Sequence, residues 1–226
     1  MFSIFKKKEK ATFYFSGHPP KNRIDSFILE FIKPVFEKHQ FKFKESDFSF
    51  EKAKDDFKQA IHFKRSRYNS KDEIVRFDII FSLFDKNYNE WHKTFYKEKA
   101  ATSQLYGQSA AHIKAWDTKF MDNTWYDLAS TDNKKIIEVI NSNIEIIGLP
   151  TLDRLSNRQN AFNELRRTSF NICPILFDYC IFENDKMKAG QIIEDFESYL
   201  HSKYKDQYEG QLETYEIRKK IYKNWA

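Results

Sequence analysis

Cysteine and glycine are scarce in this chain of 226 residues, which has two cysteines and five glycines. Cys173 and Cys180 fall in a segment with helical character, about two turns apart and too distant for a disulfide with each other. This usage favours a reducing cytoplasm. The glycines are isolated, so there is no glycine-rich phosphate loop, and Gly107 with Gln108 and Ser109 lacks the second glycine of a nucleophile elbow.

Long hydrophobic runs are also missing. The longest run is centred on residues 79–83, far below the roughly 20 residues that span a bilayer. Near the N-terminus, Lys6, Lys7, Lys8 and Lys10 follow the apolar residues instead of preceding them, which is not the pattern of a secretion signal. We therefore expect a soluble cytoplasmic protein without a membrane partner.

Residues that carry catalysis or bind metals form no recognisable pattern. The histidines are never three or four residues apart, so no helix-borne metal site is predicted. Cys173 precedes Pro174 among apolar residues, which favours an inert thiol over a nucleophile. We expect no metal, no cofactor and no catalytic residues, although an enzyme stays open as an alternative.

Aromatic residues are abundant, with 23 phenylalanines and 12 tyrosines. Residues 41–85 form the most regular stretch, because apolar residues there recur at every second position, as a half-buried strand requires. These positions are Phe41, Phe43, Phe48, Phe50, Phe57, Ile61, Phe63, Val75, Phe77, Ile79, Phe81 and Leu83. The spacing predicts an antiparallel meander.

A helix before the meander is expected to cover its apolar face. Apolar residues from 24 to 36 recur every three or four positions, and Pro34 is expected to kink the helix because it lacks a backbone donor. An edge strand is expected at residues 11–15. The predicted fold class is α+β: an antiparallel β-meander packed by an N-terminal amphipathic helix, followed by a largely helical C-terminal region.

Residues between the apolar strand positions predict a mostly cationic outer face. They are Lys42, Lys44, Lys58, His62, Lys64 and Arg76, with Glu51 and Asp78 among them. One interpretation is the ordinary polar face of a two-layer sheet. The other is a docking surface for an acidic partner or for phosphate groups. Arg65 and Arg67 favour the second, since two guanidiniums in a turn can fork onto phosphate or carboxylate, and all these basic residues are candidate binding residues.

Signals after the meander predict more helix than strand. Residues 87–99 indicate a helix, residues 105–116 fit a helix face or a strand at 112–116, and residues 125–128 indicate a strand or packed turn. A helix over residues 136–147 has a capping site at residues 130–132 and is expected to stop at Gly148 and Pro150.

The last third of the chain shows further apolar stripes at helical spacing. A short helix is expected at residues 157–167, and three more follow around Tyr179, Phe196 and Tyr215. We expect a core domain at residues 1–167 and a helical extension at residues 168–226 docked on it. These stripes indicate packing within the chain or, alternatively, a surface for a partner or a second copy.

Several short motifs together resemble the bacterial "domain of unknown function 4304" family over about residues 24–167. They are a Phe-Lys-Phe-Lys strand, Ile61-His62-Phe63-Lys64-Arg65-Ser66, Arg76-Phe77-Asp78-Ile79-Ile80, Trp125-Tyr126 and Leu149-Pro150-Thr151-Leu152. The resemblance implies this fold and a bacterial origin, and it implies no activity.

The leading hypothesis is a non-catalytic protein-binding module, such as an immunity or adaptor protein paired with a bacterial toxin, with an acidic region on its partner. The alternative is a small-molecule or phosphate-handling enzyme with a pocket between the sheet and the C-terminal helices. Nucleic-acid binding is less favoured, because the strands place their aromatic residues mainly on the face opposite the lysines.

Overall fold

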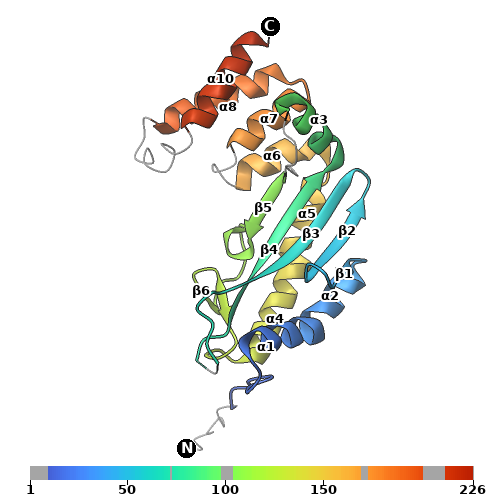
Figure 1. The fold of residues 1–226 in the computed structure, drawn as a ribbon, viewed down its shortest axis with the longest axis vertical. Coiled ribbons are helices and arrows are strands. Elements are labelled where there is room, and N and C mark those ends of the chain that lie inside the picture. Colours follow the sequence, from blue (N-terminus) through green and yellow to red (C-terminus); the bar gives the residue numbers. More distant parts are fainter. Residues whose placement is uncertain (1–9, 72, 98–103, 169–172, 201–211, 226) are drawn as a thin grey trace, which may run out of the picture. The chain divides into compact units, whose positions relative to one another are not determined.

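The computed structural model describes residues 10–71, 73–97, 104–168, 173–200 and 212–225 (Figure 1). These residues form an α+β fold with a seven-stranded antiparallel sheet, which confirms the predicted class. The strand order is β1-β2-β3-β4-β7-β6, and β5 also pairs with β4. No helix in the described ranges is both long and apolar enough to cross a membrane.

The first four strands follow one another in the sheet as the predicted meander. The strands are β1 (Lys42–Lys44), β2 (Ser49–Lys54), β3 (Phe57–Arg65), β4 (Arg76–Asp85), β5 (Tyr106–Ser109), β6 (Met121–Asp122) and β7 (Trp125–Asp127). In the β4–β7 pair, Arg76 lies opposite Asp127 and Phe77 lies opposite Tyr126. Directly paired residues lie on the same face of a sheet. Arg76 and Asp127 therefore lie on the outer face, and Phe77 and Tyr126 lie on the inner face.

The inner face of the sheet forms the core, as the alternation predicted. Phe77, Ile79 and Phe81 are fully buried. The ring of Phe77 lies 5.9 Å from that of Phe27 in the first helix. Burial of a large apolar side chain contributes about 1.5–3 kcal/mol, so this interface holds the helix on the sheet.

The N-terminal helix is confirmed, and a π-helical turn lies where the kink at Pro34 was expected. The helix consists of α1 (Pro20–Phe27), the π-turn η1 (Ile28–Ile32) and α2 (Lys33–Lys38). The backbone N–H of Lys33 donates to the carbonyl of Ile28, which is the longer π-type hydrogen bond. This turn accommodates the missing donor of Pro34 without ending the helix.

The predicted strand at residues 11–15 is wrong. Thr12 and Tyr14 donate backbone N–H groups to the side chains of Asp132 (3.2 Å) and Asn133 (2.8 Å), and the Thr12 carbonyl accepts from the Asn133 N–H at 2.8 Å. The backbone groups that a strand would use are therefore bound to the start of a later helix.

That later helix begins as predicted, but it does not stop at Gly148. Asp132 caps α4 (Asn133–Asn143), and the helix continues through the π-turn η3 (Ile144–Gly148) into α5 (Leu149–Leu155). Gly148 is required for close packing, because an added Cβ would lie 2.6 Å from Cζ of Phe81. Gly148, which was expected to end the helix, is therefore needed for packing against Phe81 instead.

The remaining elements settle the open alternatives. Residues 105–116 form β5 and a short 3₁₀ turn, η2 (Ala110–His112), so neither the helix nor the strand at 112–116 is present there. The strand at residues 125–128 is β7. The other helices are α3 (Lys86–Tyr96), α6 (Arg158–Thr168), α7 (Cys173–Phe182), α8 (Lys186–Leu200) and α10 (Leu212–Asn224). The lysines at residues 6–8 lie outside the described residues. Tyr204 and Tyr208, which belong to the apolar stripes predicted near the C-terminus, also lie outside them.

Two compact units make up the chain. The sheet unit contains Met1–Lys52, Ala60–Phe81 and Gln108–Pro150, and the helical unit contains Ala53–Gln59, Ser82–Gly107 and Thr151–Ala226. The sequence predicted a core domain up to residue 167 and a helical extension after it. This boundary between domains stays a prediction.

Candidate functional site

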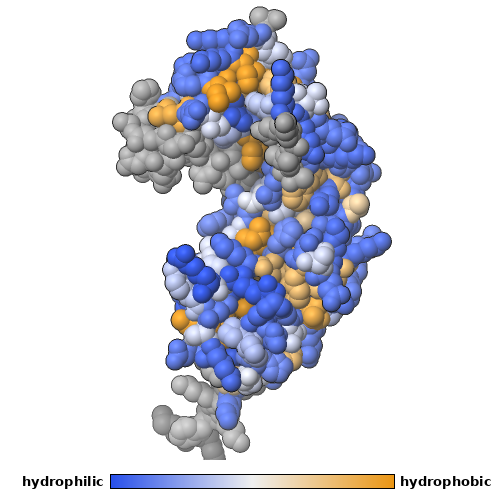
Figure 2. Space-filling view, viewed as in Figure 1, coloured by the Kyte–Doolittle hydropathy of each residue, from blue (hydrophilic) through white to orange (hydrophobic). Residues whose placement is uncertain are grey.

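The outer face of the sheet carries most of the basic residues predicted as a binding surface, and Arg65 and Arg67 are the exceptions. Lys42, Lys58 and Lys64 are exposed, and His62 is half-buried. Lys44 is paired with Glu51 at 2.9 Å. Figure 2, viewed as Figure 1, shows mostly hydrophilic residues over the sheet unit, with isolated hydrophobic residues among them.

Two aromatic rings accompany the lysines. The ammonium of Lys64 lies 5.6 Å from the ring centre of Trp125, and that of Lys58 lies 4.8 Å from the ring centre of Phe84. Such contacts contribute about 0.5–1 kcal/mol at exposed sites. The sequence placed most aromatic residues on the inner face, and it gave no sign that Trp125 would lie beside Lys64, because only the pairing of β7 with β4 brings them together.

The two arginines expected to fork onto phosphate, Arg65 and Arg67, have different partners within the protein. Arg65 is the last residue of β3, and its guanidinium forms an ion pair with Asp25 of α1. It also lies 5.0 Å from the ring centre of Phe48. The guanidinium of Arg67, by contrast, is exposed and donates to the hydroxyl of Tyr68. The guanidinium of Arg65 thus faces the helix layer, and the joint binding of one ligand by Arg65 and Arg67 stays a prediction.

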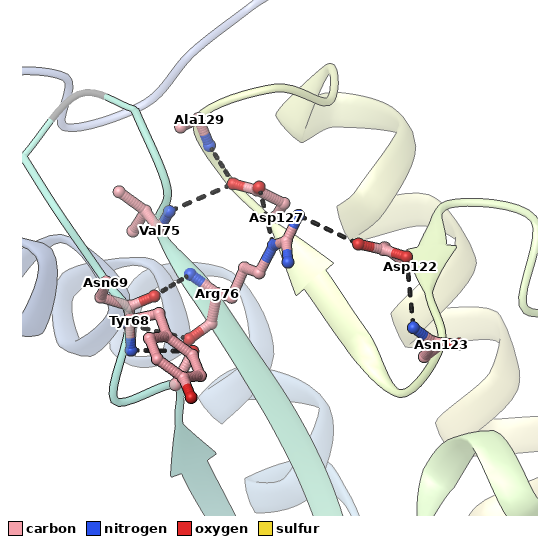
Figure 3. A network of polar contacts seen from close by, with 9 residues as sticks. Tyr68, Asn69, Val75, Arg76, Asp122, Asn123, Asp127 and Ala129 are labelled. Carbon is pink, nitrogen blue, oxygen red and sulfur yellow. Dashed lines mark hydrogen bonds and ion pairs between the residues drawn. The ribbon is translucent and has the colours of Figure 1, made fainter.

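Arg76 is neutralised by the protein itself (Figure 3). Its guanidinium donates to Asp127 at 3.1 Å and lies 3.0 Å from Asp122. The other Asp127 oxygen accepts from the backbone N–H groups of Val75 (3.2 Å) and Ala129 (3.0 Å). The network ties β4 to β7, so Arg76 is a structural residue whose charge is already used.

Asp78 is the titratable group of the outer face that differs most from its usual behaviour. It is 3% exposed, and its Oδ1 accepts from the Ser109 hydroxyl at 2.9 Å and from the Ile79 N–H at 2.7 Å. Burial raises the pKa of Asp78 to about 6, although these two hydrogen bonds, and the charges of Lys64 and His112, each lower it.

A carboxyl group with this pKa can be charged or protonated near neutral pH, which suits a general acid or base. Sequence inspection placed Asp78 on this face but did not single it out. Its hydrogen bond to Ser109 depends on β5, 31 residues further along the chain.

Metal and thiol chemistry find no support in the described residues. They contain no group of three or more histidine, cysteine, aspartate or glutamate side chains that could hold a metal ion. Burial raises the pKa of Cys180 to about 12, which keeps the thiol protonated and unreactive.

The helical unit contains an apolar groove and a more polar cavity that the sequence did not reveal. An apolar groove of about 490 Å³ lies between α3, α7 and α10 and is lined mainly by Phe95, Ile181, Ile217, Ile221 and Trp225. A second, more polar cavity of about 220 Å³ lies between α6, α7 and the start of α8.

Comparison with known proteins provides no relative for this chain, because no family model, no curated protein and no solved structure matches it. The resemblance to the "domain of unknown function 4304" family therefore stays a prediction.

Proposed function

We propose that this protein is a non-catalytic protein-binding module, and that the groove of the helical unit receives an acidic amphipathic helix of its partner. The observation that carries this proposal is the exposure of large apolar side chains in the groove. Phe95 is 41% exposed and Ile217 is 47% exposed. Contiguous apolar surface of this kind marks interaction sites in soluble proteins.

The geometry of α10 suits a helical ligand. Ile217, Ile221 and Trp225 are four residues apart, so they form a stripe about 12 Å long on one side of the helix. A partner helix with apolar residues at the same spacing would place its anchors against this stripe, which is the common helix-in-groove mode.

Basic residues favour an acidic partner. Lys220 lines the groove, and Lys223 is exposed on the same helix. Complementary charges increase the association rate and orient the partner. Lys42 and Lys64 of the sheet unit give a second basic surface with the same preference. A bacterial immunity or adaptor protein is the type of module we propose.

The proposal can be tested with a photo-crosslinking residue at position 217, introduced into the full chain in the cells that make it. The captured protein is then purified, and its affinity is measured for the unchanged chain and for Ile217→Gln. Met187→Gln is the matched control, because Met187 is an apolar residue of the same unit that is 82% exposed and does not line the groove.

We expect Ile217→Gln to weaken binding at least about tenfold, since a buried anchor contributes about 1.4 kcal/mol or more. Met187→Gln should change affinity less than about twofold, and added salt should weaken binding because the partner is acidic. Equal affinity of the two variants would contradict the proposal.

A second candidate function is acid–base catalysis at Asp78, and the raised pKa of this buried carboxyl is the observation that favours it. The test is hydrolysis of a panel of phosphate and carboxylate esters near pH 6. Activity that Asp78→Asn abolishes and Asp47→Asn retains would support it, since Asp47 is an exposed carboxylate of the same unit. Equal turnover by both variants would exclude it.

A further inference from the structure

Charged residues of both signs border the groove of the helical unit, and they are separated along α10. Glu213 and Glu216 lie in the first half of this helix, and Lys220 and Lys223 lie in the second half. All four side chains are exposed. Among the residues that the structure describes, no side chain of opposite charge forms an ion pair with any of them. These charges are therefore available to a ligand.

The charges lie on the side of α10 that faces the groove. Glu213 comes four residues before Ile217, and Glu216 comes four residues before Lys220. Ile217 and Lys220 both line the groove, and residues four apart are neighbours on one side of a helix. Lys223 comes three residues after Lys220 and ten residues after Glu213. The acidic end and the basic end of this row are therefore about 15 Å apart.

A buried ion pair fixes which side of α10 faces the groove. The guanidinium of Arg218 pairs with Asp178 of α7, which is 1% exposed, and donates to the backbone carbonyl of Pro174 at 3.2 Å. The ring of Tyr215 stacks on that of Phe196 of α8, with 4.4 Å between the ring centres. Rotation of α10 about its axis would break the ion pair and leave a buried charge uncompensated. The row of charges therefore keeps its position beside the groove.

A helical ligand has its own preferred order of charges. The N-terminal end of an α-helix carries a partial positive charge, so acidic residues stabilise its first turn, and basic residues stabilise its last turn for the opposite reason. An acidic first turn is attracted to Lys220 and Lys223. A basic last turn is attracted to Glu213 and Glu216. Both attractions are satisfied together only when the ligand helix runs in the direction opposite to α10.

We propose that the partner helix lies antiparallel to α10, with an acidic first turn beside the two lysines and a basic last turn beside the two glutamates. Its apolar anchors lie between these turns, against Ile217 and Ile221. The antiparallel direction also opposes the dipoles of the two helices, which is the favourable arrangement. This inference rests on the proposed function, and it adds the direction of the bound helix and the order of its charges.

Two positions for a photo-crosslinking residue test the direction. Ile217 and Asn224 both line the groove and are exposed, and they lie seven residues apart, about 10 Å along the helix. Each crosslinker is introduced separately into the full chain in the cells that make it, and mass spectrometry identifies the partner residues that are joined to it. Position 224 should join residues about seven positions earlier in the partner sequence than position 217 does.

The possible outcomes separate the inference from the proposed function. The reverse order of crosslinked residues would overturn the antiparallel direction and leave the proposed function intact. Capture of no protein at either position would refute the proposed function, and the inference with it.

A synthetic peptide tests the charge order without the natural partner. It is a stapled helix with leucines at the spacing of Ile217 and Ile221, glutamates in its first turn and lysines in its last turn. A second peptide has the same composition and staple, but glutamates and lysines are mixed at both ends. Fluorescence anisotropy at low salt should show that the first peptide binds the unchanged chain at least about threefold more tightly, because all its ion pairs are favourable. A benzophenone at its N-terminus should crosslink to residues 223–225.

Lys223→Glu should abolish the preference for the first peptide, because it reverses a charge at the basic end of the groove. Lys186→Glu is the matched control, since Lys186 is an exposed lysine of the same unit that does not line the groove, and this variant should keep the preference. Circular dichroism establishes that both variants are folded. No preference between the two peptides, equal effects of the two variants, or crosslinking of the peptide N-terminus to residues 212–214 would overturn the proposal.

Discussion

Asp78→Asn is expected to make the protein more stable at neutral pH. The carboxyl is 3% exposed, and burial raises its pKa from the usual 3.8 to about 6. Because the folded state binds this proton more tightly than the unfolded state, the stabilisation is complete below about pH 4 and is lost as the pH rises through about 6. A shift of about two pKa units corresponds to about 3 kcal/mol.

The asparagine variant removes this penalty while its amide oxygen can still accept from Ser109 and Ile79. Urea unfolding measures the free energy of unfolding of Asp78→Asn and of the unchanged chain at several pH values. The difference between the two should increase by up to about 3 kcal/mol, in favour of the variant, from about pH 4 to about pH 8. Most of the rise should occur below about pH 6.5, and the difference should be constant above it.

Asp47→Asn is the control for this experiment, because it removes an exposed carboxylate from the same unit. Its free energy of unfolding should follow that of the unchanged chain within about 0.5 kcal/mol at every pH. If Asp78→Asn also followed the unchanged chain, the carboxyl would have its ordinary pKa. The candidate acid–base site would then lose its basis.

Three further substitutions test the packing and the ion pairs. Gly148→Ala should lower the free energy of unfolding in urea by about 1–3 kcal/mol, because the added Cβ meets the buried ring of Phe81. Gly190→Ala is the control. Its Cβ meets the hydroxyl end of Tyr222, and it should cost less than about 0.5 kcal/mol. Arg76→Met should cost about 3 kcal/mol because it leaves the buried Asp127 without its cation, and Lys42→Met, at an exposed site, should change stability by less than about 0.5 kcal/mol. Asp178→Ala removes the buried partner of Arg218 and Tyr96, so amide hydrogen exchange over α10 should become faster. Glu213→Ala, on the exposed start of that helix, should leave the exchange unchanged. Equal exchange in the two variants would contradict the role of Asp178 in holding α10.

Local periodicity explains why much of the fold was predictable. The alternation around Phe77 and Phe81 and the helical spacing before Phe36 each depend on neighbours in the sequence, and the structure buries these residues as expected. The cap at Asp132 is likewise a local signal. The error at Gly148 has a tertiary cause, since the glycine that resembles a helix stop accommodates a ring 67 residues away.

The basic surface shows the limit of the same reasoning. Alternation identified which residues lie on the outer face, but it could not identify which charges the protein neutralises. Arg65 pairs with Asp25, 40 residues away, and Arg76 pairs with Asp127, 51 residues away. That the exposed lysines of this face bind a partner stays a prediction.

The sequence by itself determined the meander, the helix that covers it and the apolar stripes of the C-terminal helices, because these follow from the repeat of the backbone. Only the tertiary structure decided the pKa of Asp78 and the position of the apolar groove. Burial and the proximity of distant groups are properties of the packed chain, and they are what give an ordinary carboxyl an unusual environment.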